Sequence, residues 1–309
     1  MSGVLRLVVN CRTYICVFGL ASQSATLAQP PGLKEFADFS QQFAEQSTRF
    51  MPDFMQPISA EQLTAINAVE IPIAEERQFG QLVLNNYSQS LRQQKIQMLR
   101  QGPDIVYLKK LVSHLLPLLS NHRRYTTVRV TIVESDGPDA FSIPGGDILI
   151  TRGLLDSVRS EAMLIGVLAH ELSHLDRGHQ LFALRQAKVA QQKFDFRTQM
   201  NAMAAQIKPF HAEFESQADQ DAFQWLVQLG YDPMELVALL ESWNQNQDAS
   251  APWLEFMPTF IRSHPDAGKR VQALRELYSN LPKPVTCTYV GTQNLKLRIP
   301  RSDREFNEQ

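Results

Sequence analysis

The sequence predicts an α+β fold that is predominantly α-helical, with a small sheet directly ahead of a central buried helix. Apolar residues recur at helical spacing over most of the 309-residue chain. Alternation of apolar and polar residues appears at residues 126–133, and a short apolar run follows at 148–150. The stretch that follows is apolar nearly all round a helix, which is typical of a helix inside the core.

The bulk composition is that of a globular protein with a sizeable core. Hydrophobic residues make up 44% of the chain and charged residues 20%. The formal net charge of −2 gives no reason to expect a nucleic-acid partner. Cys11 and Cys16 are near the N-terminus, which leaves Cys287 alone in the rest of the chain. A disulfide framework and a Cys-based zinc site are therefore excluded, and any metal must be bound by His and carboxylate side chains.

Residues 1–28 have the layout of a secretory signal peptide. Arg6 and Arg12 precede an apolar run at residues 14–21, small and polar residues follow, and the first 34 residues contain no Asp or Glu. We expect cleavage after Ala28 and a periplasmic or secreted protein. The apolar run is short for a membrane span. An uncleaved leader acting as a membrane anchor and an organellar transit peptide are the alternatives, because transit peptides are also Arg-bearing and poor in acidic residues.

The next segment, residues 29–70, is predicted to be an extension with a Phe-rich helix. Phe36, Phe39 and Phe43 recur at helical spacing. Such a helix either packs on the main body or offers a plug or partner-binding face. A long Gln-rich helix is predicted over 73–101, where Gly102-Pro103 ends it, and another helix over 104–120.

The sheet and the central helix follow. Val128, Val130 and Ile132 alternate with polar residues in 126–133, which predicts a half-buried strand. Turns are predicted at 137–138 and 144–146, with a short strand at 148–150. The central helix is predicted over 157–177, with Ser157 or Ser160 as its cap.

The remainder of the chain is predicted to be helical as far as a final tail. Helices are expected at 181–208, 210–229 and 265–280, with one more opening at Asp232-Pro233. We therefore divide the chain into a leader at 1–28, the extension at 29–70, a main domain at 71–282 and a tail at 283–309.

The most informative motif is His170-Glu171-Leu172-Ser173-His174, an HExxH pattern within the central helix. Histidines four residues apart lie one above the other on a helix face, so their ring nitrogens can share one metal ion. Glu171 is placed to reach a water on that metal.

The third ligand must come from elsewhere, because a catalytic zinc takes three protein ligands and one open position. Glu215 and Asp219 are one turn apart on a later helix, on a face that continues into apolar residues. Buried acids need partners. A metal for Glu215, and a histidine N–H or an arginine such as Arg270 for Asp219, would satisfy both. The alternatives are a surface charge for Glu215 and a purely structural ion pair for Asp219.

Two further histidines have open interpretations. His179 follows Gly178 and is either part of the site or a histidine at a helix end with no catalytic part. His264, which precedes Pro265, is either an exposed residue near a helix cap or a displaceable ligand or transition-state donor.

These motifs together resemble the HtpX/CaaX prenyl-protease family of zinc metallopeptidases. The resemblance rests on the HExxH segment with His179, on Glu215-x-x-Ala218-Asp219, and on Ser263-His264-Pro265 with Arg270. Residues 139–155 also resemble the strand and turn before that family's active helix, although Asp139 stands where the family more often has Asn. The match covers about residues 70–280 and is nearest to the soluble, periplasmic BepA- and LoiP-like branch.

By that resemblance the fold is zincin-like and the chain binds one Zn²⁺ through His170, His174 and Glu215. Glu171 is implied as general base, Asp219 as the partner of a ligand, and His264 as a residue that can approach the zinc and hold a resting state. The strand near Ile148 is implied to accept an extended substrate.

The implied function is a zinc-dependent endopeptidase of the cell envelope that acts in protein quality control. Its substrates would be unfolded or misassembled envelope proteins, with peripheral membrane contact and no nucleic acid. A chaperone or scaffold of the same family with silent proteolysis is one alternative, and a cell-wall amidase is another. Because too little chain follows residue 280, we expect no C-terminal repeat domain of the BepA kind.

Overall fold

The computed structural model describes residues 59–189, 212–245 and 267–308. The described residues from Ala60 onward belong to one compact unit, Ala60–Gln309, which includes the predicted tail. The leader, the Phe-rich helix, most of the predicted helix at 181–208 and His264 lie outside the described residues. Within the described ranges, no helix combines the length and apolar character needed to cross a bilayer.

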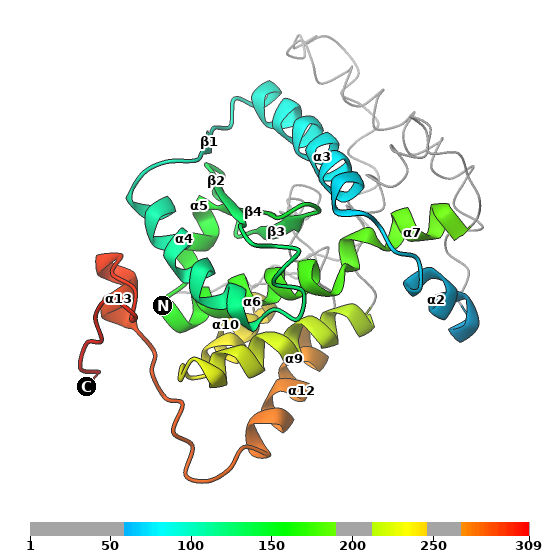
Figure 1. Ribbon diagram of the computed structural model, residues 1–309. Helices are drawn as coiled ribbons and strands as arrows, with labels where there is room; N and C mark the ends of the chain where they lie inside the picture. Colours follow the sequence, from blue (N-terminus) through cyan, green and yellow to red (C-terminus); the bar gives the residue numbers. More distant parts are fainter. Residues whose placement is uncertain (1–58, 190–211, 246–266, 309) are drawn as a thin grey trace, which may run out of the picture. The chain divides into compact units, whose positions relative to one another are not determined.

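A four-stranded sheet forms one layer of this unit, in the order β1-β2-β4-β3 (Figure 1). Its strands are β1 (Met98–Leu99), β2 (Arg129–Val133), β3 (Ala140–Ile143) and β4 (Asp147–Thr151). The strands β2 and β4 are parallel, whereas β1 and β3 run antiparallel to their neighbours. Since β4 has a partner on both sides, the expectation that the strand near Ile148 accepts substrate is wrong. The edge strands are β1, which has 2 residues, and β3, which is the outer strand beside β4.

The sheet lies between two helices, α3 (Ile73–Gln93) on one face and α6 (Glu161–Arg177) on the other (Figure 1). Phe141 of β3 meets Tyr87 of α3 edge to face, with ring centroids 5.0 Å apart. The neighbouring residue, Ser142, has its hydroxyl within 2.9 Å of Glu171 Oε2 on α6. Successive side chains of β3 thus point to opposite faces of the sheet, one toward α3 and the next toward α6.

Helix α3 ends at Gln93, although the sequence predicts a helix over 73–101. The helical sequence pattern continues past residue 93, but the chain there leaves the helix. The chain turns at Lys95, whose φ is 60°, and Met98 and Leu99 pair with β2. Backbone pairing with a strand more than 30 residues away in the sequence overrides the helical propensity of this segment.

A buried carboxylate fastens α3 to the turn between β3 and β4. Glu76 accepts hydrogen bonds from the Tyr125 hydroxyl at 2.6 Å and the Gly145 N–H at 2.8 Å, and it pairs with Arg124. Gly80 allows the close approach, since a Cβ there would lie 1.7 Å from the Pro144 carbonyl oxygen.

Helix α6 is the centre of the core, and every residue in it but Arg177 is buried. The Ser160 side chain caps its first turn, and Gly178 ends it in the left-handed conformation, with φ of 68°. Glu161 accepts from the hydroxyls of Tyr107 at 2.7 Å and Tyr231 at 2.6 Å, and from the Arg301 N–H at 2.9 Å. The C-terminal tail is therefore bound to the start of the central helix.

The remaining helices cover α6 and the sheet. Helix α9 (Ala212–Gln228) runs alongside α6, and α10 (Met234–Gln245) also packs directly on α6. Helix α12 (Ala267–Ser279) packs against α9 and α10. Gly166 faces Leu236 of α10, where a Cβ would lie 3.3 Å from the leucine Cβ, so this glycine serves helix packing. The other described helical segments are α2 (Ala60–Asn67), α4 (Pro103–Leu115), η1 (Leu116–Leu118), α5 (Arg152–Ser157), η2 (His179–Leu181), α7 (Phe182–Val189) and α13 (Thr292–Leu297).

Candidate metal centre

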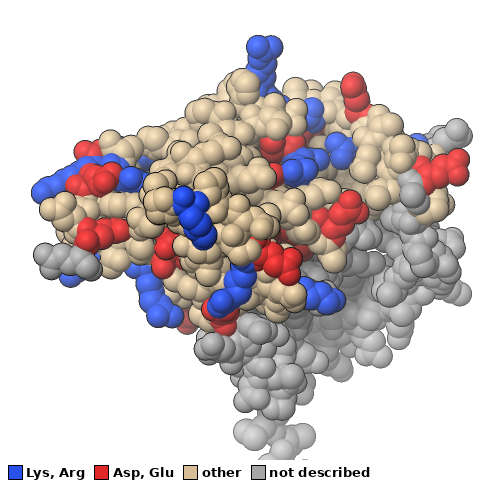
Figure 2. Space-filling view, turned by 90° about the horizontal axis from the view of Figure 1, so that it is seen from below, with Lys and Arg blue, Asp and Glu red and all other residues tan. Residues whose placement is uncertain are grey.

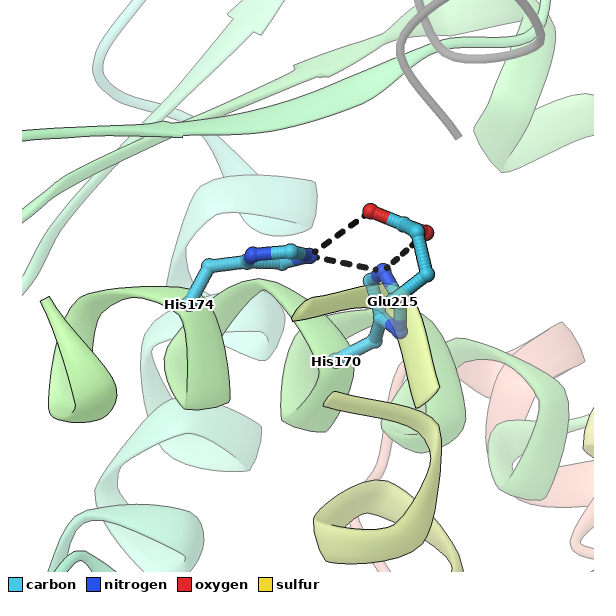
Figure 3. Close-up of side chains that lie close together, drawn as sticks. All are labelled: His170, His174 and Glu215. Carbon is cyan, nitrogen blue, oxygen red and sulfur yellow. Dashed lines mark hydrogen bonds and ion pairs between the residues drawn. The ribbon is translucent and has the colours of Figure 1, made fainter. Parts of the chain in front are cut away.

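Three predicted ligands converge in the interior (Figure 3). His170 and His174 project from one face of α6, and Glu215 reaches them from α9. The two Nε2 atoms are 3.1 Å apart, and the Glu215 carboxylate oxygens lie 3.5 Å from His170 Nε2 and 3.4 Å from His174 Nε2. Each side chain is at most 1% exposed. The surface-charge alternative for Glu215 is therefore excluded.

The spacing of these atoms fits a tetrahedral metal ion. Ligand atoms held at about 2.0–2.1 Å from such an ion lie about 3.3 Å from one another. The two Nε2 atoms are 3.1 Å apart, Glu215 Oε2 lies 3.5 Å from His170 Nε2, and Glu215 Oε1 lies 3.4 Å from His174 Nε2, so each histidine is near this separation from one carboxylate oxygen. Both histidines also have their Nδ1 atoms engaged elsewhere, so their Nε2 atoms are the ones that face the shared position. Two imidazoles and one carboxylate leave a fourth position open for water or substrate.

The outer partner of His170 is Asp219, as the sequence predicted. Asp219 Oδ1 lies 3.0 Å from His170 Nδ1, and Arg270 donates two hydrogen bonds of 2.7 Å to the Asp219 carboxylate. Arg270 also lies 3.3 Å from Glu215. Burial by itself would raise the pKa of Asp219, but the Arg270 charge and hydrogen bonds lower it to about 2. Asp219 is thus an ionised acceptor that fixes Nδ1 of His170 as the protonated nitrogen.

Glu171 lies beside the ligands and is held by the outer strand. It accepts hydrogen bonds of 2.9 Å from both the backbone N–H and the hydroxyl of Ser142. The Gln180 side-chain amide donates in turn to the Ser142 hydroxyl oxygen. Burial raises the pKa of Glu171 to about 7, although His170 and Ser142 act in the opposite direction. A carboxylate with this pKa suits proton transfer near neutral pH.

Ser142 and Gln180 are site residues that sequence reasoning did not single out. Ser142 lies in β3, before β4 and α5, and Gln180 lies in η2, after the end of α6. No fixed sequence spacing links either residue to the HExxH pattern. The only available signal was that Ser142 belongs to the strand that the family resemblance places before the active helix.

His179, which had two open interpretations, lies against a ligand. Its Nδ1 atom is 2.9 Å from His174 Nδ1, and the side chain is buried. Burial lowers the pKa of His179 to about 4, so the ring is neutral near pH 7.

A buried HExxH helix, a third ligand from a following helix and a sheet edge alongside define a metallopeptidase of the zincin type. The chain belongs to peptidase family M48, whose sequence model matches residues 106–278, more than half of the chain. It is 26% identical over 155 residues to the mitochondrial metalloendopeptidase OMA1 of Schizosaccharomyces pombe, covering 47% of this chain and 45% of that protein. It is also 26% identical over 168 residues to the mitochondrial metalloendopeptidase OMA1 of Arabidopsis thaliana, covering 51% of this chain and 33% of that protein. The chain thus spans less than half the length of these relatives.

Proposed function

We propose that the protein is a zinc-dependent endopeptidase that cleaves unfolded or misassembled proteins in the cell envelope as part of protein quality control. The observation that carries the proposal is the position of Glu171, a buried carboxylate adjacent to three converging ligands and next to the outer strand of the sheet. Zinc is the ion we infer, because two imidazoles and one carboxylate at tetrahedral spacing form a known catalytic zinc set.

The side chains around the site have separate tasks in peptide hydrolysis. When bound, zinc would polarise the scissile carbonyl and lower the pKa of the attacking water. Glu171 takes the proton from that water and passes it to the leaving amine. Ser142 holds one carboxylate oxygen of Glu171, which orients the other for this transfer. His170 and His174 are fixed in orientation by their outer partners.

The substrate would bind as an extended strand along the outer edge of β3. This edge lies beside α6, and a peptide there would pair its backbone with the strand while its scissile bond faces the ligands. Backbone hydrogen bonds depend little on the substrate's side chains, so this mode of binding selects weakly for sequence. It requires a substrate segment that can adopt an extended conformation. Both properties favour unfolded protein as substrate. Figure 2 shows acidic and basic side chains interspersed over one face, in keeping with a partner other than nucleic acid.

We propose a cell-envelope location on the basis of the predicted leader and the resemblance to the BepA- and LoiP-like branch. Both relatives are named as mitochondrial enzymes, which supports the alternative of an organellar transit peptide. The N-terminal sequence of the mature protein, together with fractionation of the cells that produce it, distinguishes an exported protein from an anchored or organellar one.

Two rivals have separate tests. Purified protein is incubated with casein and with peptidoglycan, and we expect cleavage of casein alone. Cleavage of peptidoglycan alone would establish an amidase. A chaperone with silent proteolysis would retain its function in vivo after Glu171→Gln and lose it after His174→Ala, whereas a peptidase loses its function after either change.

A further inference from the structure

His179, which follows the C-terminal end of α6, places its imidazole beside the metal centre. Gly178 adopts the left-handed conformation, which stops the helix and lets η2 begin at His179. The His179 ring then lies 2.9 Å, Nδ1 to Nδ1, from His174, the second histidine of the HExxH motif. It is 5% exposed, so it meets His174 away from bulk water.

The other ring nitrogen of His179 faces α9. Its Nε2 atom is 3.0 Å from Gln217 Oε1, and the amide nitrogen of Gln217 donates to Glu213 Oε1 at 3.3 Å. Because a carboxylate can only accept, Glu213 orients the amide so that its oxygen faces His179. That oxygen can also only accept, so His179 must carry a hydrogen on Nε2 to make this contact.

The position of this hydrogen determines the tautomer of His174. Two ring nitrogens 2.9 Å apart need one donor and one acceptor. If His174 binds the metal through Nε2, its hydrogen is on Nδ1, so His174 donates and Nδ1 of His179 accepts. The lone pair of His174 Nε2 is then directed to the position shared with His170 and Glu215. The reverse tautomer of His179 would direct a hydrogen from Nδ1 toward His174 and leave a lone pair at Nε2 facing Gln217 Oε1, so both contacts of the ring would be lost.

Aromatic packing fixes the plane of His179. Phe214 stacks on the ring, with centroids 4.3 Å apart and an angle of 6° between the planes. Phe182 meets Phe214 edge to face at 5.4 Å. Phe214 directly precedes Glu215, so α9 supplies both the third ligand and the ring that stacks on His179.

We propose that His179 and Gln217 are positioning residues that select the metal-binding tautomer of His174 and thereby set the zinc affinity of the site. The two histidine ligands then have outer partners of different chemistry. Asp219 with Arg270 supports His170 through a charged pair, whereas an imidazole backed by an amide supports His174. One helix, α9, supplies Glu215, Gln217 and Asp219. This inference rests on the metal site of the proposed function.

The test is the zinc affinity of the purified full chain, measured by competition with a chromophoric chelator. His179→Phe keeps a ring against Phe214 but removes the acceptor for His174, and Gln217→Met removes the acceptor for His179. We expect each change to weaken zinc binding by about 10–100-fold, as is typical of lost outer partners. Gln217→Glu keeps an acceptor oxygen and is expected to bind zinc at least as tightly as wild type.

Gln220→Met on the exposed face of α9 is the matched control and should leave the affinity unchanged. Thermal unfolding of the metal-free proteins separates loss of affinity from loss of fold, and Gln217 is only half-buried, so Gln217→Met tests the proposal even if His179→Phe fails to fold. Wild-type affinity in folded Gln217→Met protein would overturn the proposal. Equal weakening by Gln217→Met and Gln217→Glu would also overturn it. Wild-type protein that binds no zinc would refute the proposed function together with this inference.

Discussion

Glu171→Gln is expected to lower kcat/KM for a peptide substrate by about 10²–10⁴-fold, the range usual for loss of a general base. The amide has nearly the shape of the carboxylate and still offers an oxygen to the two Ser142 donors, but it cannot take a proton from water. Zinc content should remain at one ion per chain, since Glu171 is not among the converging ligands. Cleavage of a quenched peptide and metal analysis of the same samples measure both quantities.

The matched control is Glu276→Gln, which makes the same chemical change at an exposed position of α12 and should retain wild-type activity. If Glu171→Gln protein cleaves the peptide at the wild-type rate, Glu171 is not the base. If the variant loses its zinc as well, the loss of activity reports damage to the metal site instead.

Arg270→Met is expected to destabilise the metal-free protein by about 3–5 kcal/mol, because it leaves buried carboxylates without their cation. Arg270 is 7% exposed, donates to both oxygens of Asp219 and lies 3.3 Å from Glu215. Methionine fills much of the space of the arginine side chain, so the loss of stability comes from the missing charge more than from a cavity. Urea denaturation of the purified chain measures the change in the free energy of unfolding.

The same helix offers a control for this prediction. Arg275 of α12 pairs with Glu241 at 2.7 Å, but its side chain is 55% exposed. Arg275→Met should therefore change stability by less than about 1 kcal/mol. Similar losses for the two variants would show that burial of the Arg270 pair contributes nothing particular to stability.

The features that local spacing controls could be predicted from the sequence. The HExxH pattern and the inward face of Glu215 and Asp219 both depend on helical periodicity, and both histidines and both acids are buried together as expected. Arg270 was found because a buried acid needs a cation, and α12 supplies it. A helix extends a local pattern, so the pattern is visible in a single sequence.

Features that depend on distant partners could not be predicted. The end of α3 and the position of β1 follow from pairing between Met98–Leu99 and β2, which no local propensity indicates. The strand order puts β3 at an edge of the sheet and β4 inside it, although the apolar run at 148–150 is the stronger strand signal. Gln180 and Gln217 reach the site only through the turn after Gly178 and the packing of α9 on α6.

The dependence of peptide hydrolysis on added zinc tests the metal centre most directly. Metal-free protein is titrated with Zn²⁺ while cleavage of a quenched peptide is recorded. We expect activity to rise in proportion to zinc and to level off at one equivalent per chain, with no such rise for Glu215→Gln. Full activity in the metal-free protein, or a Glu215→Gln titration identical to that of wild type, would contradict a zinc-dependent peptidase built on His170, His174 and Glu215.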